Sequence, residues 1–156
     1  MAKNGKVNIS DLENFKKNIE KSLGSQQVND FIESCAKELA ARLLAKVIKR
    51  TPVGQYPKSS GKKGGTLRRG WTGEKSQSGA AYANTLKVIH MGNTYVIEII
   101  NPVNYASYVE FGHRTRGGDG WVEGKFMLTI SEQEVQAAAP KILEAKLKKK
   151  LGEIFK

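Results

Sequence analysis

The clearest pattern of apolar and polar positions covers residues 28–50. Apolar side chains recur there every three or four residues, with charged side chains between them, which is typical of an amphipathic helix. Pro52 lacks a backbone N–H and restricts the residue before it, so we expect this helix to end there. A second long helical pattern begins near Lys125 and continues to about residue 155, with Pro140 inside it.

A thinner helical pattern lies near the N-terminus. Leu12, Phe15 and Ile19 are spaced three and four residues apart, and Gly24 with Ser25 ends the run. We therefore predict an N-terminal amphipathic arm over residues 1–24, followed by one α+β domain over residues 25–156, since this length fits a single domain.

Between the long helices the pattern favours strands from residue 67 to residue 101. The turn around Gly92 is typical of a two-residue hairpin and sets His90 opposite Tyr95. Residues 68–75 form a plausible third strand, and residues 104–111 predict a short helix. The expected fold is therefore α+β, with an antiparallel sheet of three or more strands packed against the long helices.

Two long loops interrupt these elements. Residues 51–66 and residues 113–120 are rich in glycine and other turn formers. A loop as long as residues 51–66 inside a compact domain is usually functional or disordered.

Positive charge is concentrated in the first of these regions. The chain carries 26 Lys and Arg against 15 Asp and Glu, a net charge of +11, and residues 51–90 hold seven basic side chains against one acidic one. Such a surface attracts phosphate, although a solvated loop that keeps the protein soluble explains it equally well. The basic side chains form one group: Lys58, Lys62, Lys63, Arg68 and Arg69.

The residue types needed for catalysis do not converge in this sequence. Neither His90 nor His113 has a second histidine or a cysteine at metal-ligand spacing, and Cys35 is the single cysteine. No serine lies in a nucleophile elbow, and no phosphate-binding loop motif occurs. We expect no enzymatic activity, no metal and no cofactor. No apolar run reaches the roughly 18 residues of a membrane span, so no membrane partner is expected.

Four motifs occur in an order that resembles one phage protein family. They are Thr51-Pro52-Val53, Gly65-Thr66-Leu67-Arg68-Arg69-Gly70-Trp71, the block from Tyr105 to His113, and the block from Trp121 to Met127. Together they resemble the tailed-phage neck and tail-component family typified by gene product ten of a lambdoid coliphage. Two departures stand out: the loop between Pro52 and Leu67 is longer and more basic than the family's connector, and Gly70 replaces a common serine.

The resemblance implies a structural virion protein of the phage neck. Its subunits would form a ring, six-fold or twelve-fold, that joins the head to the tail. Expected partners are portal, adaptor or stopper proteins on one side and tail-tube or terminator proteins on the other. The location would be the head–tail junction of the virion, and the host cytoplasm before assembly. An alternative is a tail terminator or completion protein that caps the tail tube, and a more distant one is a non-specific nucleic-acid-binding protein.

The resemblance also gives roles to individual residues. The basic group would face passing DNA in the channel or dock on an acidic partner ring. Glu110, placed between aromatic residues, needs a partner such as Arg68, Arg69 or a neighbouring subunit. Together with Glu110, the remaining motif residues are expected to form the structural core that seats the short helix on the sheet: Trp71, Tyr105, Tyr108, Phe111, Gly112 and Trp121.

Overall fold

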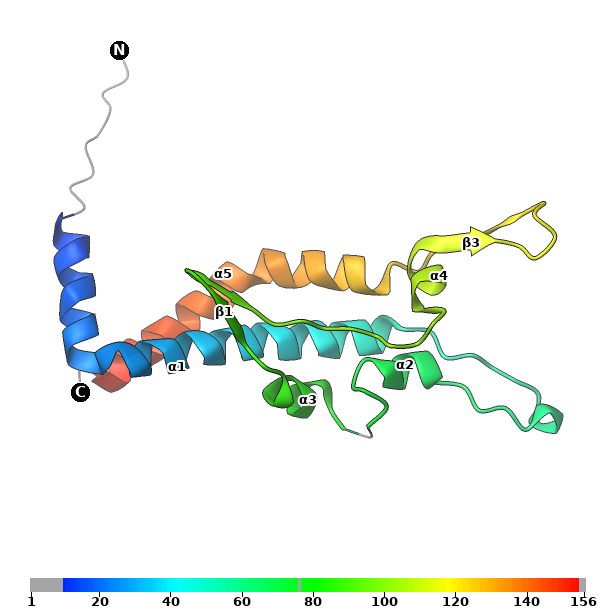
Figure 1. The fold of residues 1–156 in the computed structure, drawn as a ribbon, viewed down its shortest axis with the longest axis horizontal. Coiled ribbons are helices and arrows are strands. Elements are labelled where there is room, and N and C mark those ends of the chain that lie inside the picture. Colours follow the sequence, from blue (N-terminus) through cyan, green and yellow to red (C-terminus); the bar gives the residue numbers. More distant parts are fainter. Residues whose placement is uncertain (1–9, 76, 155–156) are drawn as a thin grey trace, which may run out of the picture. The chain divides into compact units, whose positions relative to one another are not determined.

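The computed structural model describes residues 10–75 and 77–154, and for residues 10–16, 18–20, 22 and 23 it describes the backbone alone (Figure 1). The apolar side chains predicted to make the arm amphipathic, Leu12, Phe15 and Ile19, therefore lie outside the described side chains. The chain divides into two compact units, Met1–Ser34 and Cys35–Lys156. Helix α1 (Ser10–Arg50) spans the boundary between them.

Within the first unit, helix α1 is interrupted at Gly24. This residue has φ 68° and ψ 155°, which is not a helical conformation, and glycine reaches it without steric cost. The break predicted at Gly24 and Ser25 is thus confirmed. Beyond it the helix is supported locally by the side-chain amide of Gln26, which donates a hydrogen bond of 2.8 Å to Asp30.

Two long helices frame the second unit, the end of α1 and helix α5 (Met127–Ile154). Lys146 on α5 pairs with Glu38 on α1 at 3.1 Å, and Glu134 on α5 pairs with Lys46 at 2.7 Å. A third bridge joins Arg50 to Glu134, also at 2.7 Å. Because residue numbers rise along α1 as they fall along α5, the helices are antiparallel. Both of the predicted long helices are confirmed, and α5 continues through Pro140.

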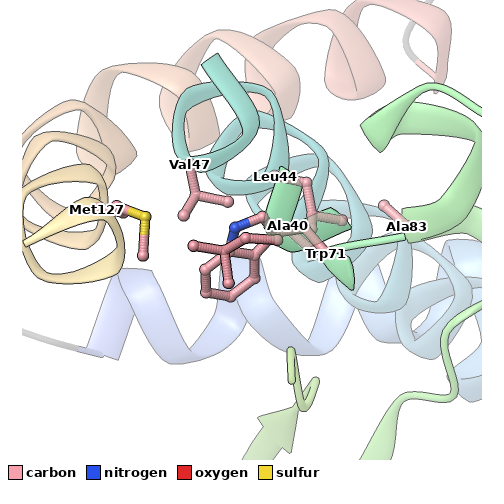
Figure 2. Packing of buried hydrophobic residues seen from close by; sticks show 7 residues of the cluster. Ala40, Leu44, Val47, Trp71, Ala83 and Met127 are labelled. Atoms are coloured by element: carbon pink, nitrogen blue, oxygen red, sulfur yellow. The ribbon is translucent and has the colours of Figure 1, made fainter. Parts of the chain in front are cut away.

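The core of this unit gathers where α1, α5 and the segments between them meet. Figure 2 shows the buried side chains converging from these elements. Burial of each large apolar side chain contributes about 1.5–3 kcal/mol to folding, so this cluster is a main source of stability. Its buried members are Ala40, Leu44, Val47, Leu67, Trp71, Ala83 and Met127.

Short helices replace part of the predicted sheet. Helix α2 (Thr66–Gly70) lies where a third strand was expected, and helix α3 (Gly79–Thr85) follows it. The Ser78 hydroxyl caps α3 by accepting a hydrogen bond of 3.1 Å from the N–H of Ala81. Gly79 is buried against α1, since a β-carbon there would lie 2.9 Å from the β-carbon of Leu44. The close approach of α3 to α1 therefore requires a glycine.

The strands form two separate hairpins. Strands β1 (Ile89–Met91) and β2 (Thr94–Val96) pair with His90 opposite Tyr95, which confirms the predicted register. Helix α4 (Ala106–Phe111), the predicted short helix, leads into β3 (Gly112–Arg114), which pairs with β4 (Trp121–Glu123). The class is α+β, but the expected sheet of three or more strands is wrong: over the described residues each sheet has two strands. The reason is that residues 66–70 and 79–85 are helical.

Candidate functional site

The first two family motifs meet at Thr51, a residue with no exposed surface. Its hydroxyl donates a hydrogen bond of 2.6 Å to the carbonyl of Val47 and accepts one of 2.8 Å from the indole N–H of Trp71. Its own carbonyl accepts two bonds from the guanidinium of Arg68, at 2.6 and 3.1 Å. Arg68 thus places positive charge at the end of α1, where helix carbonyls lack partners and the helix dipole is negative.

Asn101 fastens the other side of α2. Its side-chain amide donates a hydrogen bond of 2.8 Å to the carbonyl of Leu67, and its side-chain oxygen accepts one of 3.2 Å from the N–H of Val103. That oxygen occupies the space where a β-carbon on Gly70 would lie. The glycine at position 70 is therefore matched by the position of Asn101 in this chain.

Glu110 binds the first turn of α5, a role that the sequence pattern did not predict. Its carboxylate is buried and accepts hydrogen bonds of 2.9 Å from the backbone N–H groups of Leu128 and Thr129, and one of 2.7 Å from the Thr129 hydroxyl. These N–H groups belong to the first turn of α5, where a carboxylate satisfies unpaired donors and favours the helix dipole. The expectation that Glu110 pairs with Arg68 or Arg69 is wrong, because the start of α5 supplies its partners, whereas a contact of Glu110 with a neighbouring subunit stays a prediction.

The backbone around Glu110 is tied to the same helix start. The N–H of Lys125 donates to the carbonyl of Val109 at 2.8 Å, and the N–H of Phe126 donates to the carbonyl of Glu110 at 3.0 Å. Chains cross so closely here that a β-carbon on Gly124 would meet the Glu110 carbonyl.

Gly112 has a comparable role in the motif. It adopts φ 86°, and a β-carbon there would lie 2.5 Å from the carbonyl oxygen of Val122 and 2.9 Å from the indole of Trp121. The glycine is therefore required both by its conformation and by the packing of the β3–β4 hairpin.

Most of the motif aromatics are exposed rather than buried. Trp71 is 4% exposed and belongs to the core, as predicted. The others are between 41% and 60% exposed, so their predicted place in the core is wrong. The reason is that α4 and the β3–β4 hairpin carry them on surfaces that the rest of the second unit does not cover. They are Tyr105, Tyr108, Phe111 and Trp121.

These exposed side chains lie near one another. Tyr105, Tyr108 and Phe111 follow each other at intervals of three residues on consecutive turns near α4, a spacing that brings side chains to one side of a helix. The Trp121 indole lies beside Gly112, the residue directly after Phe111. We call these four residues the aromatic surface.

The predicted basic group divides into two parts. Lys58, Lys62 and Lys63 are exposed on the loop, in and just after the short 3-10 helix η1 (Lys58–Ser60). Arg69 is also exposed and donates longer hydrogen bonds of 3.3 and 3.4 Å to Gly64 and Thr66. Arg68 does not belong with them, because its guanidinium is half-buried and bound to Thr51.

Metal-binding side chains do not assemble in the part of the chain that the structure describes. No three His, Cys, Asp or Glu side chains there could hold a metal ion. His113 lies beside Tyr108, with 5.8 Å between the ring centroids, and His90 lies beside Tyr95 at 4.1 Å. Within residues 10–75 and 77–154, no helix combines the length and apolar composition needed to cross a bilayer.

Comparison with known proteins identifies the family. Residues 13–112 match the family described as "HK97-gp10_like: Bacteriophage HK97-gp10, putative tail-component". The match covers 100 of the 156 residues, and the chain belongs to this family of phage tail components. Searches of curated proteins and of solved structures gave no match.

Proposed function

We propose that this protein is a non-enzymatic subunit of a ring at the head–tail junction of a tailed phage or phage-derived particle. The ring joins the portal or adaptor above it to the tail below it. Family membership supports a structural role among phage tail components. We propose the ring, its position at the junction and the absence of enzymatic activity.

The observation that carries the proposal is the aromatic surface. Four aromatic side chains, each about half exposed and each with 150–250 Å² of area, leave on the order of 400 Å² of apolar surface uncovered. This is about half of what one partner contributes to a specific interface. The aromatic surface is built from the motif segments 105–113 and 121–127. The first of these segments also contains Glu110, which binds the start of α5.

A ring needs a heterologous contact, in which one patch of each subunit binds a different patch of the next. The second unit offers an apolar hollow of about 240 Å³ that is bounded by α4, the extended segment after β2 and the start of α5. Ile99, Ile100 and Leu128 line it. Phe111 borders this hollow and also belongs to the aromatic surface. The aromatic side chains that lie outside the hollow, Tyr105, Tyr108 and Trp121, would therefore pack into the hollow of the neighbouring subunit.

The description of the family as a tail component favours a second candidate. A tail terminator or completion protein would form a similar ring on the end of the tail tube. The same aromatic surface would serve either ring, so the two candidates differ in the location of the protein in the particle.

Native mass spectrometry and negative-stain imaging of the purified chain test the ring. We expect a closed oligomer of one stoichiometry, and we expect F111S/W121S to be monomeric. The matched control is M91S/L147S, which removes two apolar side chains of similar exposure elsewhere and should leave the ring intact. A chain that stays monomeric both alone and in particle extracts, or a ring that F111S/W121S leaves unchanged, would overturn the proposal.

A further inference from the structure

Two loops of the second unit carry exposed basic side chains at one end of this unit. Loop 51–66 and the loop of the β3–β4 hairpin extend from the same end of this unit, away from the core (Figure 1). Their bases are neighbours, since a hollow of about 300 Å³ is lined by Pro52, Tyr56 and Gly65 together with Tyr105 and Val109 of the α4 region.

The charges on these loops have no ionic partners among the described residues. Lys58, Lys62 and Lys63 on the first loop and Arg114 and Arg116 on the second are all exposed, and no ion pair within residues 10–75 and 77–154 includes them. Asp119 is the single acidic residue in either loop, which leaves five positive charges against one negative charge.

We propose that these two loops form a cationic rim that binds the phosphate backbone of duplex DNA without reading its sequence. The five cations would each neutralise a phosphate, and counterion release would supply most of the affinity. Binding to DNA does not require ring formation, so this activity goes beyond the proposed structural role.

Three observations favour DNA over an acidic protein as the occupant. Lysine is depleted in protein interfaces, whereas the first loop carries three lysines in six residues. Tyr56 is 51% exposed on the same loop, and the ammonium of Lys62 lies 5.9 Å from its ring centroid. The tyrosine hydroxyl adds a hydrogen-bond donor beside the lysines, and tyrosine is among the side chains that contact phosphate oxygens in protein–DNA complexes. Most of the exposed aromatic side chains, those of the aromatic surface, lie near α4 and on β4, outside the two loops.

The salt dependence of binding gives the sharpest test. The probe is a fluorescein-labelled 30-base-pair duplex of random sequence, titrated with the full chain at several salt concentrations. Five phosphate contacts predict a slope of log K against log salt of about −4.5, or about 500-fold weaker binding between 50 and 200 mM salt. In K58Q/K62Q/K63Q, two contacts remain, so the slope should fall to about −1.8 and the loss to about 12-fold. R114Q/R116Q should give a slope of about −2.7.

The control removes the same charge from elsewhere in the unit. K49Q/K141Q/K149Q neutralises three exposed lysines on α1 and α5. Its slope of log K against log salt should differ from the wild-type slope by less than about one. Equal losses of DNA affinity in the control and in K58Q/K62Q/K63Q would overturn the inference. A wild-type slope in K58Q/K62Q/K63Q, or no binding of the wild type to DNA at 50 mM salt, would overturn it as well.

Particle assembly, scored in the same variants, separates this inference from the proposed function. If the loop variant binds DNA normally but heads and tails fail to join, the loops dock on an acidic protein and the DNA inference is wrong. If the loop variant loses DNA binding while the protein is absent from the head–tail junction, the proposed function fails and the DNA inference stands.

Discussion

The indole N–H of Trp71 lies 2.8 Å from the hydroxyl oxygen of Thr51 and donates a hydrogen bond to it, with both side chains buried. Twenty residues separate the two in sequence, and each belongs to a different family motif. Their contact fastens the short helix α2 to the end of α1. It also explains why the chain has a threonine, rather than another helix-ending residue, directly before Pro52.

Replacement of the Thr51 hydroxyl should destabilise the second unit. In T51V the buried indole N–H loses its acceptor, and an unsatisfied buried donor costs about 1–3 kcal/mol. Urea unfolding followed by Trp fluorescence measures the change. The control is T85V, which removes an exposed hydroxyl bonded at 2.8 Å to the carbonyl of Tyr82 and should change the free energy of unfolding by less than about 0.5 kcal/mol. Equal effects in the two variants would contradict the role of Thr51.

Glu110 should stabilise the start of α5 through its charge as well as its shape. E110Q keeps the size of the side chain, but its amide NH2 group opposes backbone donors, and we expect a loss of about 1–3 kcal/mol. Hydrogen exchange of the Leu128 and Thr129 amides should accelerate. The control E132Q changes an exposed carboxylate on the same helix and should have little effect. Unchanged exchange at both amides in E110Q would argue against the capping role.

The space at Gly70 predicts a cost for any larger residue. A β-carbon there meets Asn101 and Val103, and the hydrogen bonds of Asn101 to Leu67 and Val103 hold it in place. We expect G70A to destabilise the protein by about 1–3 kcal/mol. The matched control is G152A in α5, where a β-carbon meets nothing within 4 Å. That variant should stabilise by about 0.5–1 kcal/mol, and a stabilising G70A would show that Asn101 can move.

Acid should weaken the pairing of α1 with α5. Hydrogen bonds from Arg42 and Lys146 lower the pKa of Glu38, and hydrogen bonds from Lys46 and Arg50 lower the pKa of Glu134. A carboxyl group whose pKa is lowered in the folded state stabilises the fold at pH values above its unfolded pKa of about 4.5. This stabilisation is lost as the pH falls through the folded-state pKa.

The midpoint of urea unfolding, measured from pH 6 to pH 3, checks this dependence. We expect E38Q/E134Q to lose less stability than the wild type over that range. E132Q/E153Q, which changes two exposed glutamates, should retain the wild-type pH dependence. Identical profiles in E38Q/E134Q and the wild type would contradict the assignment.

Sequence patterns predicted the elements whose signals are local. The apolar period over residues 28–50 and the proline after Thr51 define the end of α1, and the glycine at position 92 fixes the register of β1 and β2. Helices α2 and α3 were missed because helices of five and seven residues are too short to form on their own. Tertiary contacts create them, although Ser78 before an alanine-rich run was a usable capping signal.

The site was predicted less completely than the fold. Glu110 was correctly expected to need a partner, but that partner lies 18 and 19 residues away in a helix start whose orientation no local pattern reveals. The hairpin β3–β4 could have been found from the glycine-rich turn between two β-forming segments. The spacing of the aromatic residues near α4 predicted that they share one side of a helix. Spacing alone does not show whether another part of the same chain covers that side or leaves it exposed.

Electron microscopy of particles from the phage or prophage that encodes this chain tests the central claim most directly. With F111S/W121S in place of the wild type, the account predicts DNA-filled heads and separate, complete tails, whereas M91S/L147S should give joined particles with antibody label at the head–tail junction. Normally joined particles that carry F111S/W121S, or label confined to another part of the particle, would contradict it.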